Sequence, residues 1–293
     1  MIPIIERVRS GEILFCDGAM GTFLQAKGLA AGECPELWCV DRAEDVKAIH
    51  QAYRDAGSQI VETNSFGGSR FKLKHYGLED RVAEINEAAT AIAKEVAGEE
   101  QYVLASVGPT GEFMEPLGLI SEAEMIAVFE EQIAALAKGG ADLIIIETMT
   151  AAEEAAAAVK AARNVCDLPV VASFTFDPQA KGGYRTMMGL TPAAVAAAMQ
   201  EVGADILSAN CGTGMDDMIA IVKALRDAAP DTPIMAMANA GRPVVENGKT
   251  VFKETPADMA AKVPALVEAG ASIIGGCCGT SPAHIQAMRQ AIS

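Results

Sequence analysis

The sequence of 293 residues lacks the excess of basic residues that binding to nucleic acids or anionic membranes requires. It has 23 lysines and arginines against 39 aspartates and glutamates, which gives a formal net charge of −16. We therefore expect neither nucleic acid nor a membrane as a partner. The sequence also lacks an unbroken apolar run of the roughly 18 residues that a spanning helix needs. Its first residues, MIPIIERVRSGE, contain no signal-peptide core, so we expect a mature protein that begins here and stays in the cytoplasm.

Disulfide bonds are not expected, although the chain has 7 cysteines. An odd number of cysteines in a protein without an export signal predicts reduced thiols. Free cysteine behaves as a small hydrophobe, so some of these thiols should belong to the core. The others are candidate metal ligands or nucleophiles.

Short apolar runs alternate with amphipathic, alanine-rich stretches along the whole chain. Apolar runs without polar alternation are typical of parallel strands that are buried on both faces. The stretches between them carry helix signals, such as Thr255-Pro256 before one start and Gly139 or Gly270 at an end. The expected strands are 13–17, 59–63, 102–107, 143–148, 169–176, 205–211, 233–239 and 272–278, and the expected helices are 43–57, 81–97, 121–139, 151–165, 191–202, 215–229, 256–269 and 281–292.

Eight strands alternating with eight helices predict an α/β protein that is a single (β/α)8 TIM barrel, with one domain over residues 1–293. A doubly wound open sheet is the alternative, but such a sheet rarely contains eight units with no change in composition. Neither a linker nor a low-complexity tract marks a domain boundary. We expect the longer loops 18–42, 64–80 and 177–190 to surround an active site.

Reactive residues of such barrels lie at the carboxyl ends of the strands. Each expected strand ends in a polar or sulfur-bearing side chain, whereas the opposite ends are apolar. The residues at these carboxyl ends are Asp17, Glu62, Asn64, Ser106, Glu147, Thr175, Asn210, Cys211, Asn239, Cys277 and Cys278.

Three cysteines stand out in this set, because Cys211 ends one expected strand while Cys277 and Cys278 end another. Zinc binds thiolates tetrahedrally, and a catalytic zinc site keeps three protein ligands and one open position. Neighbouring residues on a strand point to opposite faces, so the chain must kink for both Cys277 and Cys278 to reach one ion, and the flanking glycines would allow this. Core packing and a redox-active pair of adjacent cysteines are the alternatives. Cys34 and Cys39 are interpreted as structural, since no further ligands accompany them.

Two acidic positions indicate an amino acid as substrate. Glu147 follows a wholly apolar strand, where a carboxylate is costly unless it meets a cation such as a substrate ammonium. Asp17 begins the segment DGAMGT, in which Gly18 and Ala19 would let backbone N–H groups approach a substrate carboxylate. A site for a thiophilic metal beside these two sites fits an amino acid that carries a thiol.

These residues resemble the homocysteine S-methyltransferases, a family of zinc-dependent barrels. The resemblance covers essentially the whole chain, and the pairing of ANCGTG with GGCCGTSPAHI is its most specific feature. SVGPTG and NAGRP resemble the homocysteine module of cobalamin-dependent methionine synthase more than the betaine-using branch. The matching segments are DGAMGT (17–22), ETNSF (62–66), SVGPTG (106–111), IIIET (144–148), ANCGTG (209–214), NAGRP (239–243) and GGCCGTSPAHI (275–285).

The resemblance implies that Cys211, Cys277 and Cys278 hold Zn²⁺ and are the residues essential for catalysis. It further implies that Asp17, Gly18, Ala19 and Glu147 contact the amino-acid end of homocysteine, that Asn64 and Ser106 line the site, and that Asn239 occupies the open zinc position when substrate is absent. Two residues depart from the family pattern: Ala209 replaces a common glycine, and Arg242 replaces an apolar residue. Arg242 could change how the methyl donor docks.

The implied reaction moves a methyl group to the thiolate of homocysteine and forms methionine. The methyl donor suggested by the methionine synthase likeness is methylcobalamin on a separate corrinoid protein or module. S-methylmethionine, S-adenosylmethionine and betaine are alternative donors. A barrel that binds zinc or thiols without catalysis is the alternative from another class, and a phosphate-binding barrel that uses the loop 275–281 is a third.

Overall fold

Eight parallel strands form a closed barrel in the computed structural model, which describes residues 1–246 and 248–292. Their order around the barrel is β1, β12, β9, β8, β5, β4, β3, β2. A parallel bridge between Cys16 and Ile60 joins the first strand to the last and closes the ring. The strands are β1 (Leu14–Phe15), β2 (Ile60–Glu62), β3 (Tyr102–Val107), β4 (Leu143–Met149), β5 (Val170–Phe174), β8 (Ile206–Asn210), β9 (Ile234–Ala238) and β12 (Ile273–Gly276).

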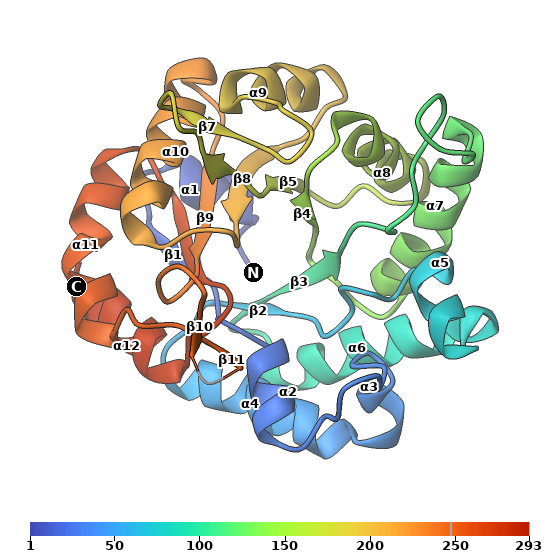
Figure 1. The fold of residues 1–293 in the computed structure, drawn as a ribbon. Coiled ribbons are helices and arrows are strands. Elements are labelled where there is room, and N and C mark those ends of the chain that lie inside the picture. The colour runs from blue at the N-terminus through green and yellow to red at the C-terminus, as the bar shows by residue number, and fades with distance from the viewer. Residues whose placement is uncertain (247, 293) are drawn as a thin grey trace.

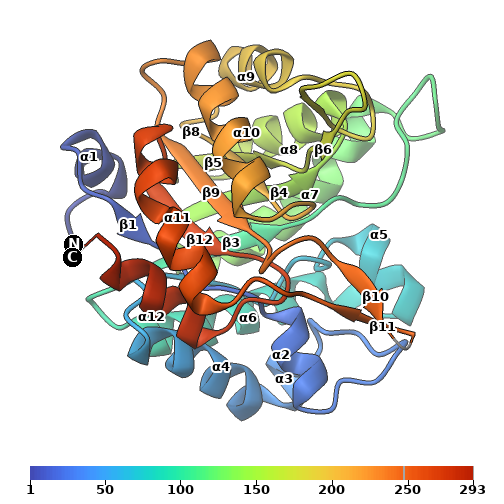
Figure 2. The same cartoon turned by 60° about the vertical axis from the view of Figure 1, so that its left-hand side comes forward.

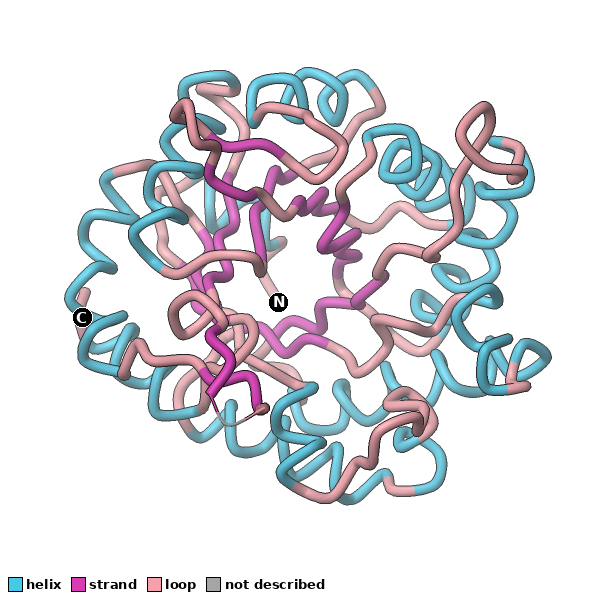
Figure 3. Tube along the Cα trace, viewed as in Figure 1, coloured by secondary structure: helices cyan, strands magenta, loops and turns pink. Residues whose placement is uncertain are grey.

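Eight long helices surround this barrel, as Figures 1 and 3 show. The structure thus confirms the predicted (β/α)8 architecture, and each element lies within a few residues of its expected position. No helix among the described residues is long and apolar enough to cross a membrane. The outer helices are α4 (Ala43–Asp55), α6 (Val82–Ala97), α7 (Glu122–Lys138), α8 (Ala152–Val165), α9 (Pro192–Glu201), α10 (Met215–Ala228), α11 (Pro256–Glu268) and α12 (Pro282–Gln290).

The helix ends largely follow the predicted signals. The hydroxyl of Thr255 accepts a hydrogen bond from the N–H of Asp258, and the Asp258 carboxylate accepts one in return from the N–H of Thr255. Gly139 is the C-cap of α7, as expected, with a φ of −67°, and the next residue, Gly140, has the left-handed φ of +105°. Gly139 also lies close to α6, where a Cβ would come 2.7 Å from Thr90.

Shorter elements lie in the loops at the carboxyl ends of the strands. The hairpin β10–β11 in the loop after β9 was not expected from the sequence. The loop elements are α2 (Gly21–Ala26), α3 (Trp38–Asp41), α5 (Arg70–Leu73), η1 (Lys74–Tyr76), η2 (Glu79–Arg81), β6 (Asp177–Pro178), β7 (Tyr184–Arg185), β10 (Val244–Glu246) and β11 (Lys249–Val251).

The amino end of the barrel is closed by a helix that precedes the first strand. Ile4 and Val8 of α1 (Ile4–Arg9) pack against the first inward-facing residues of the strands, among them Leu14 and Leu143. In Figure 1 the N-terminus lies at the centre of the ring of strands, and Figure 2 shows α1 at the opposite end of the barrel from the hairpin β10–β11. The barrel is therefore open only at its carboxyl end, which we call the mouth.

Candidate active site

A cavity of about 300 Å³ lies at the mouth. Because every second residue of a strand faces the barrel interior, the inward positions of β4 read Leu143, Ile145 and Glu147, and only the last of these is polar. Most of the predicted site residues border this cavity, whereas Asp17 and Asn239 lie buried behind its wall. The predicted residues that line it are Gly18, Ala19, Asn64, Ser106, Glu147, Cys211, Cys277 and Cys278.

The structure brings together the three cysteines that the sequence singled out. The sulfur atoms of Cys211, Cys277 and Cys278 lie within 4.8 Å of one another, and those of Cys211 and Cys278 are 3.9 Å apart. No other group of three or more histidine, cysteine, aspartate or glutamate side chains within residues 1–246 and 248–292 has a spacing that suits a metal ion. All seven cysteines are free thiols. This spacing fits one tetrahedral zinc ion with three thiolate ligands.

The backbone reaches this arrangement through two sharp turns. Cys211, directly after β8, has the left-handed φ of +61°, which is uncommon for a residue with a side chain. After β12 the chain turns at Gly279, which has a φ of +80°. Gly275 and Gly276 lie in the strand itself, and Gly275 leaves room for a neighbour, since a Cβ there would come 2.9 Å from the Cβ of Cys16. The expected kink thus depends on Gly279, while Gly275 permits close packing.

Electrostatics within the cluster favour one thiolate. Hydrogen bonds from the thiols of Cys277 and Cys278 lower the pKa of Cys211, and the side chain of Asn239 contributes in the same direction. The pKa of Cys277 is raised by its interactions with the same two sulfurs and by burial. The Oδ1 atom of Asn239 is buried and has no hydrogen-bond partner among the described residues. An unpartnered oxygen beside three thiols suits a role as an additional metal ligand.

Glu147 lies beside the thiols and is held by neutral donors. Ser106 donates a hydrogen bond to one of its carboxylate oxygens, and the Nδ2 atom of Asn210 donates one of 3.1 Å to the other. Burial raises the pKa of Glu147 to about 7, although the hydrogen bond from Ser106 opposes this shift. A buried carboxyl with this pKa is suited to an ammonium ligand, which would stabilise its ionised form.

Two further carboxyl groups lie next to Glu147. Burial raises the pKa of Asp17 to about 7, and burial together with the nearby carboxyl groups of Glu147 and Asp17 raises the pKa of Glu62. Asp17 accepts a 2.9 Å hydrogen bond from the backbone N–H of Glu62, which ties β1 to β2. The Oε1 atom of Glu62 is buried without a partner in the described part of the chain. Asp17 thus supports the site from behind, while Glu62 borders the cavity itself.

Some predicted positions have structural partners that the sequence did not reveal. The N–H of Ala19 donates to the hydroxyl of Thr280 over 3.1 Å, so this N–H already has a hydrogen-bond partner within the protein. Asn64 donates to the carbonyl of Pro35 over 2.8 Å and thereby joins the first two loops of the mouth. The thiol of Cys39 donates to the carbonyl of Asn64, which agrees with a structural role for this cysteine. Arg242 pairs with Asp217 of α10 at 2.7 Å.

Three residues of the mouth had no role assigned from the sequence. Glu62 and Thr148 line the cavity, and Asn210 bonds to Glu147 from within the barrel. Glu62 and Asn210 were among the candidates at the strand ends, but the resemblance assigned them no function. The sequence did not single out Thr148, because its unusual feature, a left-handed φ of +58°, is a property of the folded backbone.

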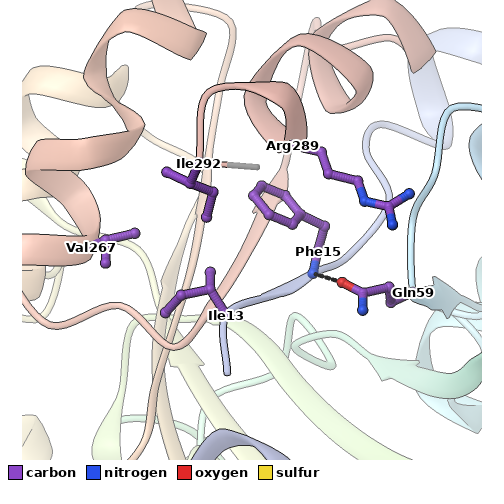
Figure 4. A pocket seen from close by; sticks show the side chains of 6 residues that line it. All are labelled: Ile13, Phe15, Gln59, Val267, Arg289 and Ile292. Atoms are coloured by element: carbon purple, nitrogen blue, oxygen red, sulfur yellow. Dashed lines mark hydrogen bonds between the residues drawn. The ribbon is translucent and has the colours of Figure 1, made fainter. Parts of the chain in front are cut away.

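A separate cavity at the amino end of the barrel does not share this chemistry. Figure 4 shows its six lining residues, which include Phe15, Val267 and Ile292, with Gln59 and Arg289 as the polar members. Gln59 accepts a hydrogen bond from the N–H of Phe15 over 3.1 Å. This cavity borders β1 and the last helices, whereas the three clustered thiols and the carboxyl groups of Glu62 and Glu147 border the cavity at the mouth.

Comparisons with known proteins agree with this site. The chain matches the family model described as homocysteine S-methyltransferase over residues 14–292, and it belongs to that family. It is 32% identical to methionine synthase of Mycobacterium tuberculosis (strain ATCC 25618 / H37Rv) over 98% of its own length, and 30% identical to methionine synthase of Mycobacterium leprae (strain TN) over 96%. The chain spans about a quarter of the length of these curated relatives, 25% and 24% respectively.

The fold also has a counterpart among solved structures. The metallated form of the homocysteine methyltransferase MmuM from Escherichia coli superposes with a TM-score of 0.79, at 24% sequence identity. The match covers 98% of this chain and 99% of that one. The likeness shows that the two proteins share the barrel fold.

Proposed function

We propose that this protein transfers a methyl group to the thiolate of homocysteine and so forms methionine. The observation that carries the proposal is the meeting of three thiols with buried carboxyl groups in one cavity at the barrel mouth. The membership in the homocysteine S-methyltransferase family supports the same reaction.

Cys211, Cys277 and Cys278 would hold a zinc ion, and their spacing leaves one tetrahedral position for the substrate sulfur. When bound, zinc would lower the pKa of the substrate thiol, so that the nucleophilic thiolate is present at neutral pH. Asn239 would occupy the open position before the substrate arrives. A general base is not needed, in agreement with the absence of histidine among the residues lining this described cavity.

The carboxyl groups would bind the other end of the substrate. Glu147 would accept the ammonium group of homocysteine, with Glu62 protonated beside it and Asp17 supporting both. Gly18 and Ala19 lie at the cavity wall, where the backbone of Gly18 would face the substrate carboxylate, while the N–H of Ala19 is bound by Thr280. These contacts orient the thiol toward the three cysteines.

The methyl donor we propose is methylcobalamin carried by a separate corrinoid protein or module. The methionine synthase relatives support this choice, and so does the surface around the mouth. Eight exposed large apolar side chains lie on the loops after β2, β3, β5 and β9, a surface of the kind that mediates contacts between proteins. They are Phe66, Phe113, Leu117, Leu119, Met187, Met188, Val244 and Val245.

The test of the mechanism is Cys211→Ala, with Cys166→Ala as the matched control, because the Cys166 thiol lies at the end of α8 and donates to Ala162. We expect Cys211→Ala to lose both bound zinc and homocysteine methylation, and Cys166→Ala to keep both. Zinc would be measured by atomic absorption. A Cys211→Ala protein that methylates homocysteine without zinc would disprove the mechanism.

The donor is tested by measuring homocysteine consumption with methylcobalamin, S-methylmethionine, S-adenosylmethionine and betaine in parallel. We expect turnover with methylcobalamin. Turnover with a sulfonium or betaine alone would overturn the donor but not the acceptor. Tight zinc binding without measurable homocysteine binding would instead favour a non-catalytic subunit.

A further inference from the structure

The side chain of Asn210 spans the barrel interior between two strands that are not neighbours. Asn210 ends β8, while its partners lie on β4, and β5 runs between these two strands. Between these two strands, the Oδ1 atom of Asn210 accepts a 2.7 Å hydrogen bond from the hydroxyl of Ser173 on β5. Asn210 is fully buried. Its carboxamide is thus a fixed bridge across the top of the barrel.

Every hydrogen-bonding position of this carboxamide is used. Besides Ser173, Oδ1 accepts the backbone N–H of Thr148 at 2.9 Å. Nδ2 donates to the Thr148 hydroxyl at 2.7 Å and to the Glu147 carboxylate at 3.1 Å. A primary amide offers two donors and two acceptor positions, so the side chain has no capacity left and only one orientation satisfies all four bonds.

This bridge joins the two left-handed residues of the mouth. Among residues 1–246 and 248–292, Thr148 and Cys211 are the only residues other than glycine with a positive φ, +58° and +61°. Asn210 binds Thr148 through its side chain and precedes Cys211 in the chain. Such a conformation is unfavourable for a β-branched residue and persists only where neighbours hold it in place. Asn210 supplies that restraint on the Thr148 side.

We propose that Asn210 is a positioning residue that fixes the Glu147 carboxylate at a set distance from the Cys211 sulfur. The proposal rests on the proposed function, in which Glu147 receives the ammonium group of homocysteine and Cys211 lies beside its sulfur. Asn210 touches neither end of the substrate, and it acts through Glu147.

The experiment compares two ligands on the zinc-loaded protein by calorimetry: homocysteine and 4-mercaptobutanoate, which lacks the amino group. For Asn210→Ala we expect homocysteine to bind about tenfold more weakly or worse, because Glu147 loses a buried charge-assisted hydrogen bond. The affinity for 4-mercaptobutanoate should change less than about twofold. A merely structural role of Asn210 would weaken both ligands alike, and that result would overturn the proposal.

Three further variants make the outcome specific. Ser173→Ala removes a bond to the same Oδ1 atom and leaves Glu147 untouched, so it should bind both ligands like the wild type. In a Glu147→Gln background, Asn210→Ala should add less than about a twofold loss, since its partner carboxylate is already gone. Asn210→Ser serves if the alanine variant does not fold, as judged by circular dichroism, and the same selective loss is expected.

The failure of this inference can be told from the failure of the proposed function. A wild-type protein that does not bind homocysteine contradicts the proposed function and this inference with it. A wild type that binds homocysteine, together with variants of Asn210 that bind it equally well, contradicts only the role of Asn210.

Discussion

The two ends of the barrel are built by the same strands but from different side chains. At the amino end, inward residues such as Leu143 and Ile206 form an apolar layer against Ile4 and Val8 of α1. Four residues further along the same strands, the inward positions are Glu147 and Asn210. Burial of apolar surface in the first layer stabilises the fold. In the second layer, buried carboxyl groups and residues with a left-handed backbone lower the stability of the fold.

This difference shows that stability and chemistry are separated along the barrel axis. The mouth keeps groups that are unfavourable in a folded protein, such as the buried carboxyl of Glu62 and the left-handed Cys211. The apolar layer below them offsets these costs. Changes at the amino end should therefore lower stability without altering ligand binding, whereas changes at the mouth should alter ligand binding and can remove the cost of its buried groups.

The largest effect is expected from Leu104→Ala in the apolar layer, where Leu104 is fully buried on β3. The loss of buried surface and the cavity left behind should lower the free energy of unfolding by about 2–5 kcal/mol. Urea denaturation measures this change. Zinc content and homocysteine affinity, measured where the variant is folded, should stay as in the wild type. A variant that loses zinc while folded would contradict the separation of the two layers.

The next effect concerns the pH dependence of stability at the mouth. The pKa of Glu147 is about 7 in the folded protein, against the ordinary 4.5 of an exposed glutamate. The folded state thus keeps a proton that the unfolded state releases, so this group makes the wild type less stable as pH rises between these two values. Glu147→Gln lacks this effect. In zinc-free protein we expect the variant to gain about 1–3 kcal/mol over the wild type from pH 4 to pH 8.

Thermal or urea unfolding across this pH range tests the expectation. A difference between Glu147→Gln and the wild type that stays constant with pH would mean that Glu147 does not titrate in this window.

A smaller effect separates the two neighbouring glutamates of the mouth. Burial raises the pKa of both glutamates, but the hydrogen bond that they share raises the pKa of Glu62 and lowers that of Glu147, which favours the proton on Glu62 and the charge on Glu147. Glutamine resembles a protonated glutamate, so Glu62→Gln should weaken homocysteine binding by less than about threefold. Glu147→Gln removes the charge and should weaken it by about tenfold or more. Equal losses in calorimetry would assign the charge to the pair rather than to Glu147.

The smallest effect is expected at the rim, with Arg242→Leu, which restores the apolar residue usual in the family. Arg242 pairs with Asp217, but its side chain is 56% exposed. Exposed ion pairs contribute about 0–1 kcal/mol, so the melting temperature should fall by only a few degrees or less. Zinc binding should not change. Differential scanning calorimetry measures the shift, and a large loss of stability would show that this pair anchors the loops of the mouth.

The sequence predicted the barrel well because its signals are local. Apolar runs mark strands such as β4, and hydroxyl residues before proline mark helix starts, as at Thr255. The convergence of Cys211 with Cys277 and Cys278 followed from the rule that strand ends meet at one face. These predictions needed no knowledge of side-chain contacts.

The features that could not be predicted depend on contacts between distant segments. Asn210 was visible at a strand end, but its reach across β5 to Thr148 exists only in the folded barrel. The use of the Ala19 N–H by Thr280 is likewise a contact between the two ends of the chain. The close approach of Gly139 to Thr90 of α6 is another such contact, which the sequence around Gly139 does not show.

The helix that closes the amino end also determines the route by which ligands reach and leave the site. Because α1 covers the amino end, a ligand of the site reaches it and leaves it through the mouth. If the proposed function holds, the protein that delivers the methyl group would cover the same opening. We then expect an ordered reaction, in which homocysteine binds before the carrier docks and methionine leaves after the carrier departs.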